Sequence, residues 1–266
     1  MIKLISTDFD GTAYAELEQP PVAVELQELI GEFQRQGAKW VINTGRDMPG
    51  LMECLERMEL NVKPDYLVLV EREIHRRDGA SYVELDGWND RCRVEHETLF
   101  VQVRRDLTRL SSWVQSRYDA VIYEDAYSPF CYMASCAEDA ADIHRYLDEY
   151  CLEVPKLMVM RNHVYARFCH SEYHKGSALA EVARHMGIEA GEVFAAGDHL
   201  NDLPMLTRRY AGYLAAPGNA LDEVKEAVRG GKGYVSELPQ GRGVAEALKH
   251  YLGAREGAKA GSGSYK

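Results

Sequence analysis

The sequence predicts an α/β protein with a Rossmann-like parallel sheet, into which a second, α+β domain is inserted. Two observations support this fold class. Short apolar segments alternate with helical patterns over the first 70 residues, as is typical of parallel strands joined by crossover helices. The same alternation resumes after about residue 170, beyond a long stretch in which the order of elements is different.

The first segment contains three predicted strands and two predicted helices. The apolar run at 3–8 is the first strand, and a helix follows whose apolar residues recur at helical spacing until Gly37. A second strand at 39–43, a helix at 49–58 and a third strand at 66–70 continue the pattern. Their alternation favours a parallel arrangement.

A hairpin and then a different pattern follow this segment. Asp78-Gly79 is a two-residue turn signal between strands at 73–77 and 81–85. The next predicted elements are a helix whose apolar residues run from Leu99 to Val114, strands at 120–124 and 130–135, a helix at 137–150, and strands at 156–160 and 164–168. This αββαββ order predicts a compact inserted domain at 89–169.

The core domain is therefore discontinuous in sequence and comprises residues 1–88 and 170–254. Its later part contains a predicted helix at 176–186, a strand at 193–196 and a helix from about 221 to 228. Residues 255–266 are rich in Ala, Gly, Ser and Lys without apolar periodicity, so we expect a disordered tail.

The composition is that of a folded globular protein, with 46% hydrophobic and 27% charged residues. The net charge of -11 argues against a nucleic-acid-binding surface, which requires clustered Lys and Arg. A small anionic substrate remains compatible with this charge if a metal and a few local donors reverse the field at the site. The six cysteines form no C-x-x-C pair, so the sequence predicts neither a zinc site nor a disulfide framework.

The sequence gives no sign of a membrane or secretory segment. No stretch reaches the roughly 18 apolar residues of a membrane-spanning helix, and the first residues lack the pattern of a signal peptide. We therefore expect a cytoplasmic protein with no membrane partner, and the oligomeric state stays open.

Two carboxylates follow the first predicted strand, in Asp8-Phe9-Asp10-Gly11-Thr12. Ligands of parallel sheets bind at this carboxyl edge. Side chains alternate along a strand, so Asp8 and Asp10 can point to the same side and share a divalent cation. Taken alone, Asp-Gly-Thr is more often only a turn.

Two motifs offer groups that bind phosphate. Thr44-Gly45-Arg46 closes the second strand with a hydroxyl, a flexible backbone and a helix N-terminus. Lys175 opens the helix after the insert, from where its ammonium can stabilise negative charge on a phosphoryl group. Singly, these are commonly a helix cap and a surface lysine.

An acidic motif, residues 197–202, follows the strand at 193–196 and brings Asp198 and Asp202 to the same edge. Such oxygen ligands suit Mg²⁺ better than zinc. An acidic loop that only caps a helix is the alternative, and it is plausible for Asp202. Chance assembly of all four motifs in this order is improbable.

In this order of motifs the sequence resembles the haloacid dehalogenase (HAD) superfamily of hydrolases. The long insert is similar to the type-two (C2) cap of its Cof-like and sucrose-phosphatase-like members. The resemblance implies a Mg²⁺-dependent phosphohydrolase that cleaves small phosphate monoesters, of the sugar-phosphate class, through an aspartyl-phosphate. Two alternatives remain: a phosphotransferase or phosphomutase that uses the same intermediate, and a catalytically silent binding protein.

The resemblance also implies roles for individual residues. Asp8 would attack phosphorus, while Asp10 would protonate the leaving oxygen and then activate water. The implied Mg²⁺ ligands are Asp8, the backbone carbonyl of Asp10, Asp198 and Asp202. The implied phosphate-binding residues are Thr44, Gly45, Lys175 and Asn201, of which Asn201 would orient Lys175 or the acidic loop.

Two further features concern specificity. Cof-like relatives carry an Asn-Gly-Ala turn after the third strand, whereas this chain has Glu71-Arg72-Glu73, so substrate contacts made from that turn do not transfer. Within the insert, the candidate contacts to a sugar hydroxyl or a second anion are Arg161, His163 and Arg167. Surface charge is the commoner role of such residues.

Overall fold

The computed structural model describes residues 1–58 and 60–261, and its contacts divide the chain into two compact units. Unit 1 contains Met1–Glu84 together with the segment from Lys175 onward, and unit 2 is Leu85–His174. The predicted insert at 89–169 lies inside unit 2. Unit 1 is thus assembled from two segments of the chain.

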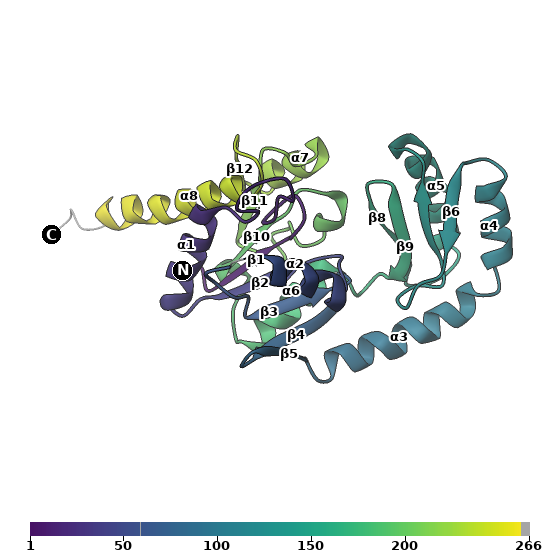
Figure 1. Ribbon diagram of the computed structural model, residues 1–266, viewed down its shortest axis with the longest axis horizontal. Helices are drawn as coiled ribbons and strands as arrows, with labels where there is room; N and C mark the ends of the chain where they lie inside the picture. Colours follow the sequence, from purple (N-terminus) through teal and green to yellow (C-terminus); the bar gives the residue numbers. More distant parts are fainter. Residues whose placement is uncertain (59, 262–266) are drawn as a thin grey trace. The chain divides into compact units, whose positions relative to one another are not determined.

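Unit 1 is built on a sheet whose strand order is β12-β11-β10-β1-β2-β3-β4-β5 (Figure 1). Neighbouring strands from β12 to β3 pair in parallel, and β4 and β5 add an antiparallel edge. The strands are β1 Leu4–Thr7, β2 Lys39–Asn43, β3 Tyr66–Leu69, β4 Glu73–Asp78, β5 Ser81–Glu84, β10 Val193–Ala196, β11 Tyr213–Ala216 and β12 Tyr234–Val235. The sheet confirms the predicted fold class and adds β11 and β12, which the sequence patterns did not predict.

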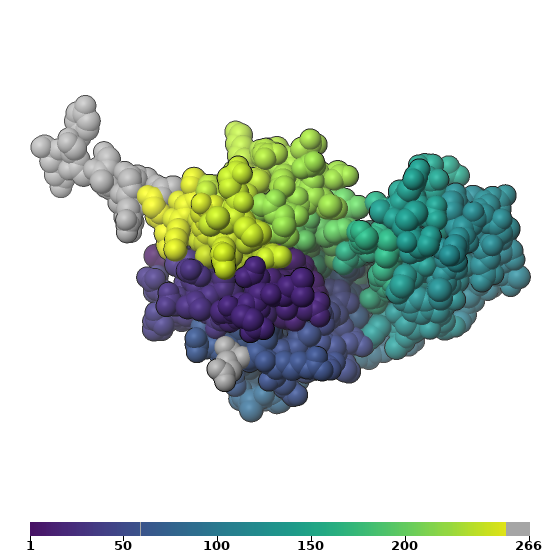
Figure 2. Space-filling model, turned by 45° about the horizontal axis from the view of Figure 1, so that its top comes forward, coloured from purple at the N-terminus to yellow at the C-terminus, as the bar shows by residue number. Residues whose placement is uncertain are grey.

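Helices cover both faces of this sheet. They are α1 Val24–Arg35, α2 Met48–Arg57, α6 Lys175–His185, α7 Asp222–Gly230 and α8 Gln240–Gly261, with short 3₁₀ turns η1 Ala190–Glu192 and η2 Leu200–Asp202. Helices α1 and α8 contact each other, and in Figure 2 the N-terminal (purple) and C-terminal (yellow) segments lie side by side. On the other face, α6 contacts β3 and β4. None of the helices in the described part of the chain is long and apolar enough to cross a membrane.

The apolar core of unit 1 explains why the ends of its strands are firmly placed. Its largest members come from the sheet, α1 and α8 and include Ile5, Leu26, Ile30, Trp40, Ile42, Leu67, Phe194 and Leu248, all of which are at most 1% exposed. Each such side chain contributes about 1.5–3 kcal/mol through burial. The loops at the carboxyl ends of the strands therefore start from rigid positions.

Helix α8 corrects one expectation about the C-terminus. Residues 255–261 were expected to be disordered, but α8 continues to Gly261, and residues 262–266 lie outside the described part. The expectation depended on the lack of apolar periodicity. Ala, Arg, Glu and Lys are strong helix formers, and extending an existing helix costs far less than nucleating one.

Unit 2 contains an antiparallel sheet in the order β6-β7-β9-β8. Its elements are α3 Trp88–Val103, α4 Leu107–Gln115, β6 Ala120–Tyr123, β7 Cys131–Ala134, α5 Ala137–Cys151, β8 Leu157–Asn162 and β9 Tyr165–His170. The three helices share one apolar core with the sheet, as predicted for the insert. The single helix predicted through Leu99 and Val114 is instead two, α3 and α4. Asp106 lies at the break, where its carboxylate accepts a hydrogen bond from Tyr150 at 3.1 Å.

Candidate active site

The strand register brings three of the sequence motifs to one edge of the sheet. Thr7, the last residue of β1, pairs with Ile42 of β2 and with Ala196 of β10. The residues that follow these strands therefore leave the sheet at the same level. The backbone N–H of Asp8 donates to the carbonyl of Ala196 at 2.9 Å, which ties the first motif to the strand that precedes the acidic motif.

Lys175 supplies a buried positive charge at this edge. Its side chain is fully buried, and its Nζ donates to Asp8 Oδ1 and to Asp202 Oδ1, both at 2.6 Å. Burial opposes the charged form, but the adjacent carboxylates of Asp202 and Asp8 outweigh it and raise the pKa of Lys175. Asn43 anchors the backbone here by donating from Nδ2 to the Lys175 carbonyl at 3.0 Å. The ammonium is thus permanently charged and fixed between two acids.

Three carboxylates gather around this one ammonium. Oxygen atoms of Asp8, Asp198 and Asp202 lie within 4.8 Å of one another. Burial, followed by repulsion from Asp202, raises the pKa of Asp8 well above its ordinary value and that of Asp198 to about 6. The carboxylates outnumber the ammonium, and this imbalance favours a divalent cation with oxygen ligands.

Two residues of the first motif, Gly11 and Thr12, lie directly against the side chain of Asp198. The Thr12 hydroxyl donates to Asp198 Oδ1 at 2.5 Å. Gly11 has φ of +77°, and a Cβ there would lie 2.5 Å from Asp198 Oδ2. Only glycine fits both this backbone conformation and this close approach. Asp198 is therefore held beside Asp8, where the two can serve as ligands to one cation.

Asp202 differs from the other two acids, because protein donors already engage both of its oxygens. Oδ1 accepts from Lys175, and Oδ2 accepts the backbone N–H groups of Asp198 at 2.9 Å and His199 at 3.0 Å. Its side chain is fully buried. Asp202 thus fixes the backbone of the acidic loop and the position of the Lys175 ammonium. Asp8 and Asp198 are better suited than Asp202 to act as direct ligands of a Mg²⁺ ion.

Asp10 does not share the carboxylate group of Asp8, contrary to the strand-alternation argument. β1 ends at Thr7, so alternation no longer governs the side chain of Asp10. Both of its oxygens instead accept from Arg46 Nε and Nη2, each at 2.7 Å, and its side chain is 45% exposed. The Arg46 guanidinium lies 5.6 Å from the centre of the Phe9 ring. Arg46 was visible in the Thr-Gly-Arg motif, but sequence reasoning gave it no role.

Two of the phosphate-binding candidates, Thr44 and Gly45, lie in the loop that follows β2, and Asn201 lies in the acidic loop. Thr44 is 1% exposed, and its hydroxyl accepts the backbone N–H of Arg46 at 3.1 Å. Asn201, expected to orient Lys175 or the acidic loop, donates from Nδ2 to Glu71 Oε1 at 2.8 Å. In the sequence, Glu71 differs from the Asn-Gly-Ala turn of Cof-like relatives, and no local pattern indicates its contact with Asn201. Among the described residues, the buried Oδ1 of Asn201 has no hydrogen-bond partner, so an acceptor remains available in the site.

Comparison with known proteins identifies the family. The family model described as sucrose-6F-phosphate phosphohydrolase matches residues 1–252. The chain belongs to this family. This phosphohydrolase is thus a HAD-superfamily phosphatase that acts on phosphate monoesters, and the antiparallel sheet of unit 2 matches a C2 cap.

Individual relatives agree on the class of reaction and differ in substrate. The 5-amino-6-(5-phospho-D-ribitylamino)uracil phosphatase YcsE of Bacillus subtilis (strain 168) is 27% identical, over 94% of this chain and 96% of that protein. A phosphoglycolate phosphatase of Methanothermobacter thermautotrophicus is 39% identical over 79 residues, which are 30% of this chain and 33% of that protein. The solved sucrose-phosphatase of Synechocystis sp. PCC6803, in complex with sucrose and phosphate, has a TM-score of 0.70 at 18% identity, covering 94% and 98% of the two chains. At that identity the last comparison shows a shared fold.

The three cap candidates of this phosphohydrolase do not form one group. Arg161 on β8 pairs with Ala166, which is fully buried under the helices. The side chain of Arg161 therefore lies on the helix-covered face of the cap sheet. Arg167, one residue further along β9, starts from the opposite face and lies 5.3 Å from the ring of Tyr165. His163 lies in the β8–β9 turn with φ of +54°.

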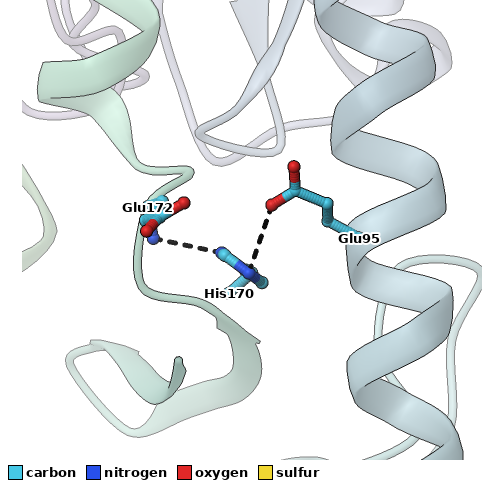
Figure 3. Close-up of side chains that lie close together, drawn as sticks. All are labelled: Glu95, His170 and Glu172. Atoms are coloured by element: carbon cyan, nitrogen blue, oxygen red, sulfur yellow. Dashed lines mark hydrogen bonds and ion pairs between the residues drawn. The ribbon is translucent and has the colours of Figure 1, made fainter. Parts of the chain in front are cut away.

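A second set of potential metal ligands lies in the cap, where Glu95, His170 and Glu172 approach one another (Figure 3). Nδ1 of His170 accepts the backbone N–H of Glu172 at 3.2 Å, so the neutral ring carries its proton on Nε2, which lies 3.4 Å from Glu95 Oε2. Lys156 Nζ is 3.3 Å from Glu172 Oε2. These side chains and Lys156 thus form a network of hydrogen bonds and ion pairs that joins α3 to the segments next to β8 and β9.

We expect this histidine to make the phosphohydrolase sensitive to mild acid. Burial lowers the pKa of His170 from its ordinary 6.5, against the influence of Glu95 and Glu172, while Lys156 adds to the lowering. The unfolded chain therefore takes up a proton below pH 6.5 that the folded ring resists, and stability falls as the pH drops below 6.5. Urea unfolding at pH 7.5 and 5.5 should show a larger loss for the wild type than for His170→Gln. Equal losses would contradict this assignment.

Proposed function

We propose that this protein is a Mg²⁺-dependent hydrolase of small sugar phosphates that works through an aspartyl-phosphate on Asp8. The observation that carries the proposal is the buried ion-pair arrangement in which Lys175 joins Asp8 to Asp202, with Asp198 alongside. Burying three acids around one ammonium costs free energy of folding, and groups with pKa values perturbed in this way cluster at functional sites. The family match supports phosphate esters as the substrates of that chemistry.

Asp8 is suited to attack phosphorus. Lys175 holds one carboxylate oxygen, which fixes the orientation of the group and leaves the other oxygen to form the new P–O bond. Mg²⁺, held by Asp8 and Asp198 when bound, would supply positive charge to the phosphoryl oxygens. Thr44 and the Gly45 amide lie in the loop that would bind those oxygens, and Lys175 would neutralise charge that develops on them.

Asp10 is suited to move the protons of both half-reactions. Arg46 holds both oxygens of the Asp10 side chain in the free protein, and in the second step this carboxylate would take a proton from the attacking water. In the first step Asp10 must donate a proton to the leaving oxygen. We therefore propose that substrate binding draws Asp10 away from Arg46.

The sugar-phosphate class rests on weaker support than the reaction does. The family description names a sucrose phosphate, and the Synechocystis enzyme was solved with sucrose and phosphate. Among the cap candidates, Arg167 has the setting most suited to a polar leaving group, since Tyr127 and Tyr165 lie near its guanidinium at 5.8 and 5.3 Å. Arg161 and His163 remain further candidates for such contacts.

The proposal is tested by measuring phosphate release from sugar phosphates, nucleotides and an aryl phosphate. We expect release to stop with EDTA and to return with excess Mg²⁺, because Asp8 and Asp198 otherwise repel each other and the substrate. Asp198→Asn should raise the Mg²⁺ concentration needed for half-maximal activity by at least about tenfold. The exposed Asp86→Asn serves as its matched control.

Three results would count against the proposal. Release that persists in EDTA would exclude the metal, and an unchanged Mg²⁺ requirement in Asp198→Asn would remove that residue from the metal site. Turnover that requires an added bisphosphate or a sugar acceptor would favour the phosphomutase or phosphotransferase instead.

A further inference from the structure

The turn after β3 has an unusual backbone. Val70 and Glu71, neither of them glycine, have φ values of +44° and +69°. The left-handed region is unfavourable for L-residues by roughly 1–2 kcal/mol per residue, and it is rare for a β-branched side chain such as valine. Two such residues in succession persist only where the surrounding structure holds them.

The phosphate-binding loop, residues 44–46, is what holds this turn. The backbone N–H of Val70 donates to the carbonyl of Arg46, and that of Glu71 donates to the carbonyl of Thr44, both at 2.9 Å. The conformation of the turn is therefore set by the same residues that are placed to receive a phosphate. It projects the side chain of Glu71 from this loop.

That side chain reaches the acidic loop, residues 197–202. Glu71 is 8% exposed, and its Oε1 accepts from Nδ2 of Asn201, which is 3% exposed and 130 positions away in sequence. The same Oε1 would lie 3.4 Å from a Cβ placed on Gly45. One carboxylate thus lies against the phosphate-binding loop and bonds to the acidic loop.

We propose that Glu71 is a positioning residue that ties the acidic loop to the phosphate-binding loop and so sets the distance of Asp198 from Asp8. The proposal rests on the proposed function, since it concerns the same metal and phosphate groups. Thr12 holds Asp198 from the side of β1, and the Asp202 carboxylate holds the loop by accepting the backbone N–H groups of Asp198 and His199. The hydrogen bond between Glu71 and Asn201 holds the acidic loop from a third direction, that of the loops that follow β2 and β3.

The charge of Glu71 fits this role. A further carboxylate near three others raises the repulsion within the site, so a neutral acceptor would be preferred if only filling space mattered. A hydrogen bond to an ionised acceptor is roughly twice as strong as a neutral one. The tie to Asn201 is therefore firm, and it uses residues that differ from the Asn-Gly-Ala turn of Cof-like relatives.

The test compares Glu71→Ala, Glu71→Gly and Glu71→Gln by titrating Mg²⁺ alone in a calorimeter and by measuring kcat. Removing a partner that orients a ligand loop should weaken Mg²⁺ binding about 10- to 100-fold in the Ala and Gly variants. Gln keeps the acceptor for Asn201 and should stay within about fivefold of the wild type. Glycine suits the positive φ, so Glu71→Gly should melt at a higher temperature than Glu71→Ala without recovering the metal affinity.

Two controls distinguish loss of the Glu71–Asn201 hydrogen bond from a general effect of removing a carboxylate. Glu56→Ala removes an exposed carboxylate from unit 1 and should leave Mg²⁺ binding unchanged. In the double variant Glu71→Ala with Asn201→Ala, the second change should add little, because both act on one contact. Fully additive losses would show that the two side chains act separately and would overturn the proposal.

The remaining outcomes are also decisive. Wild-type affinity and kcat in Glu71→Ala would overturn the tie, as would a Gln variant that binds Mg²⁺ as weakly as Ala. If Glu71→Ala fails to fold, the Gln and Gly variants still give the comparison. A wild-type protein that neither binds Mg²⁺ nor releases phosphate would instead contradict the proposed function, so the two failures are distinguishable.

Discussion

Replacing Asp8 by Asn is expected to reduce phosphate release by roughly 10⁴-fold or more, as loss of a nucleophile does in other covalent mechanisms. The amide has the same shape but cannot form the phosphoryl bond. It also removes one of three crowded carboxylates, and burial, followed by repulsion from Asp202, is what raises the pKa of Asp8. We therefore expect the folded protein to be at least as stable as the wild type, because Lys175 keeps Asp202 as its partner.

The measurement is phosphate release beside a thermal melt of the same preparation. Asp86→Asn is the matched control, because it removes an exposed aspartate of unit 2 and should change neither quantity. Turnover that survives in Asp8→Asn would end the assignment of the nucleophile. A variant that is inactive only because it is unfolded would show a lowered Tm, and the structure gives no reason for that result.

Replacing Lys175 by Met should have the largest effect on stability. The ammonium is fully buried, and its loss leaves Asp8 and Asp202 facing each other without a counter-charge. Breaking a buried ion pair by removing one partner costs about 3–5 kcal/mol. The exposed Lys156→Met, which removes a surface pair with Glu172, should cost less than about 1 kcal/mol.

The cause of that loss can be checked with a second change. If unpaired negative charge is responsible, Lys175→Met combined with Asp202→Asn should regain part of the free energy of unfolding measured by urea titration. If the loss arises from packing alone, the second change should lower stability further. Activity should stay low in both variants, because the charge that stabilises the phosphoryl oxygens is absent.

The parallel core and its catalytic edge were predictable because their signals are local. Apolar strands, helical spacing and the residues that follow each strand all lie within short windows, and the sheet register then places Asp8 and the acidic loop together. Strand β12 gave a weak signal because it has only two residues. β11 has four residues, as β1 and β10 do, so its length does not explain why it was not predicted. The first part of helix α8 was not predicted although Val244, Leu248 and Tyr251 recur there at helical spacing, whereas its part from residue 255 has no apolar stripe and depends on propensity.

The contacts within the site were less accessible to sequence reasoning. The carboxylate of Asp10 was expected to point to the same side as that of Asp8, but the chain leaves the strand before it, and Arg46 engages both of its oxygens. The metal contact implied for the Asp10 backbone carbonyl stays a prediction. The bond between Glu71 and Asn201 joins two loops 130 residues apart and depends on a backbone conformation that these residue types seldom adopt. No local pattern encodes such a pair, so only the structure shows it.

The position of β10 in the sheet has a consequence for synthesis of the chain. β1 pairs with β2 on one side and with β10 on the other, yet unit 2 separates β10 from β1 in sequence. A nascent chain that ends before residue 193 therefore presents β1, at the middle of the future sheet, as an open apolar edge. The ribosome must also reach Asp202 before Lys175 has both of its partners. Truncated products should therefore be both inactive and prone to aggregation, and early chaperone binding to the first segment would protect the nascent enzyme.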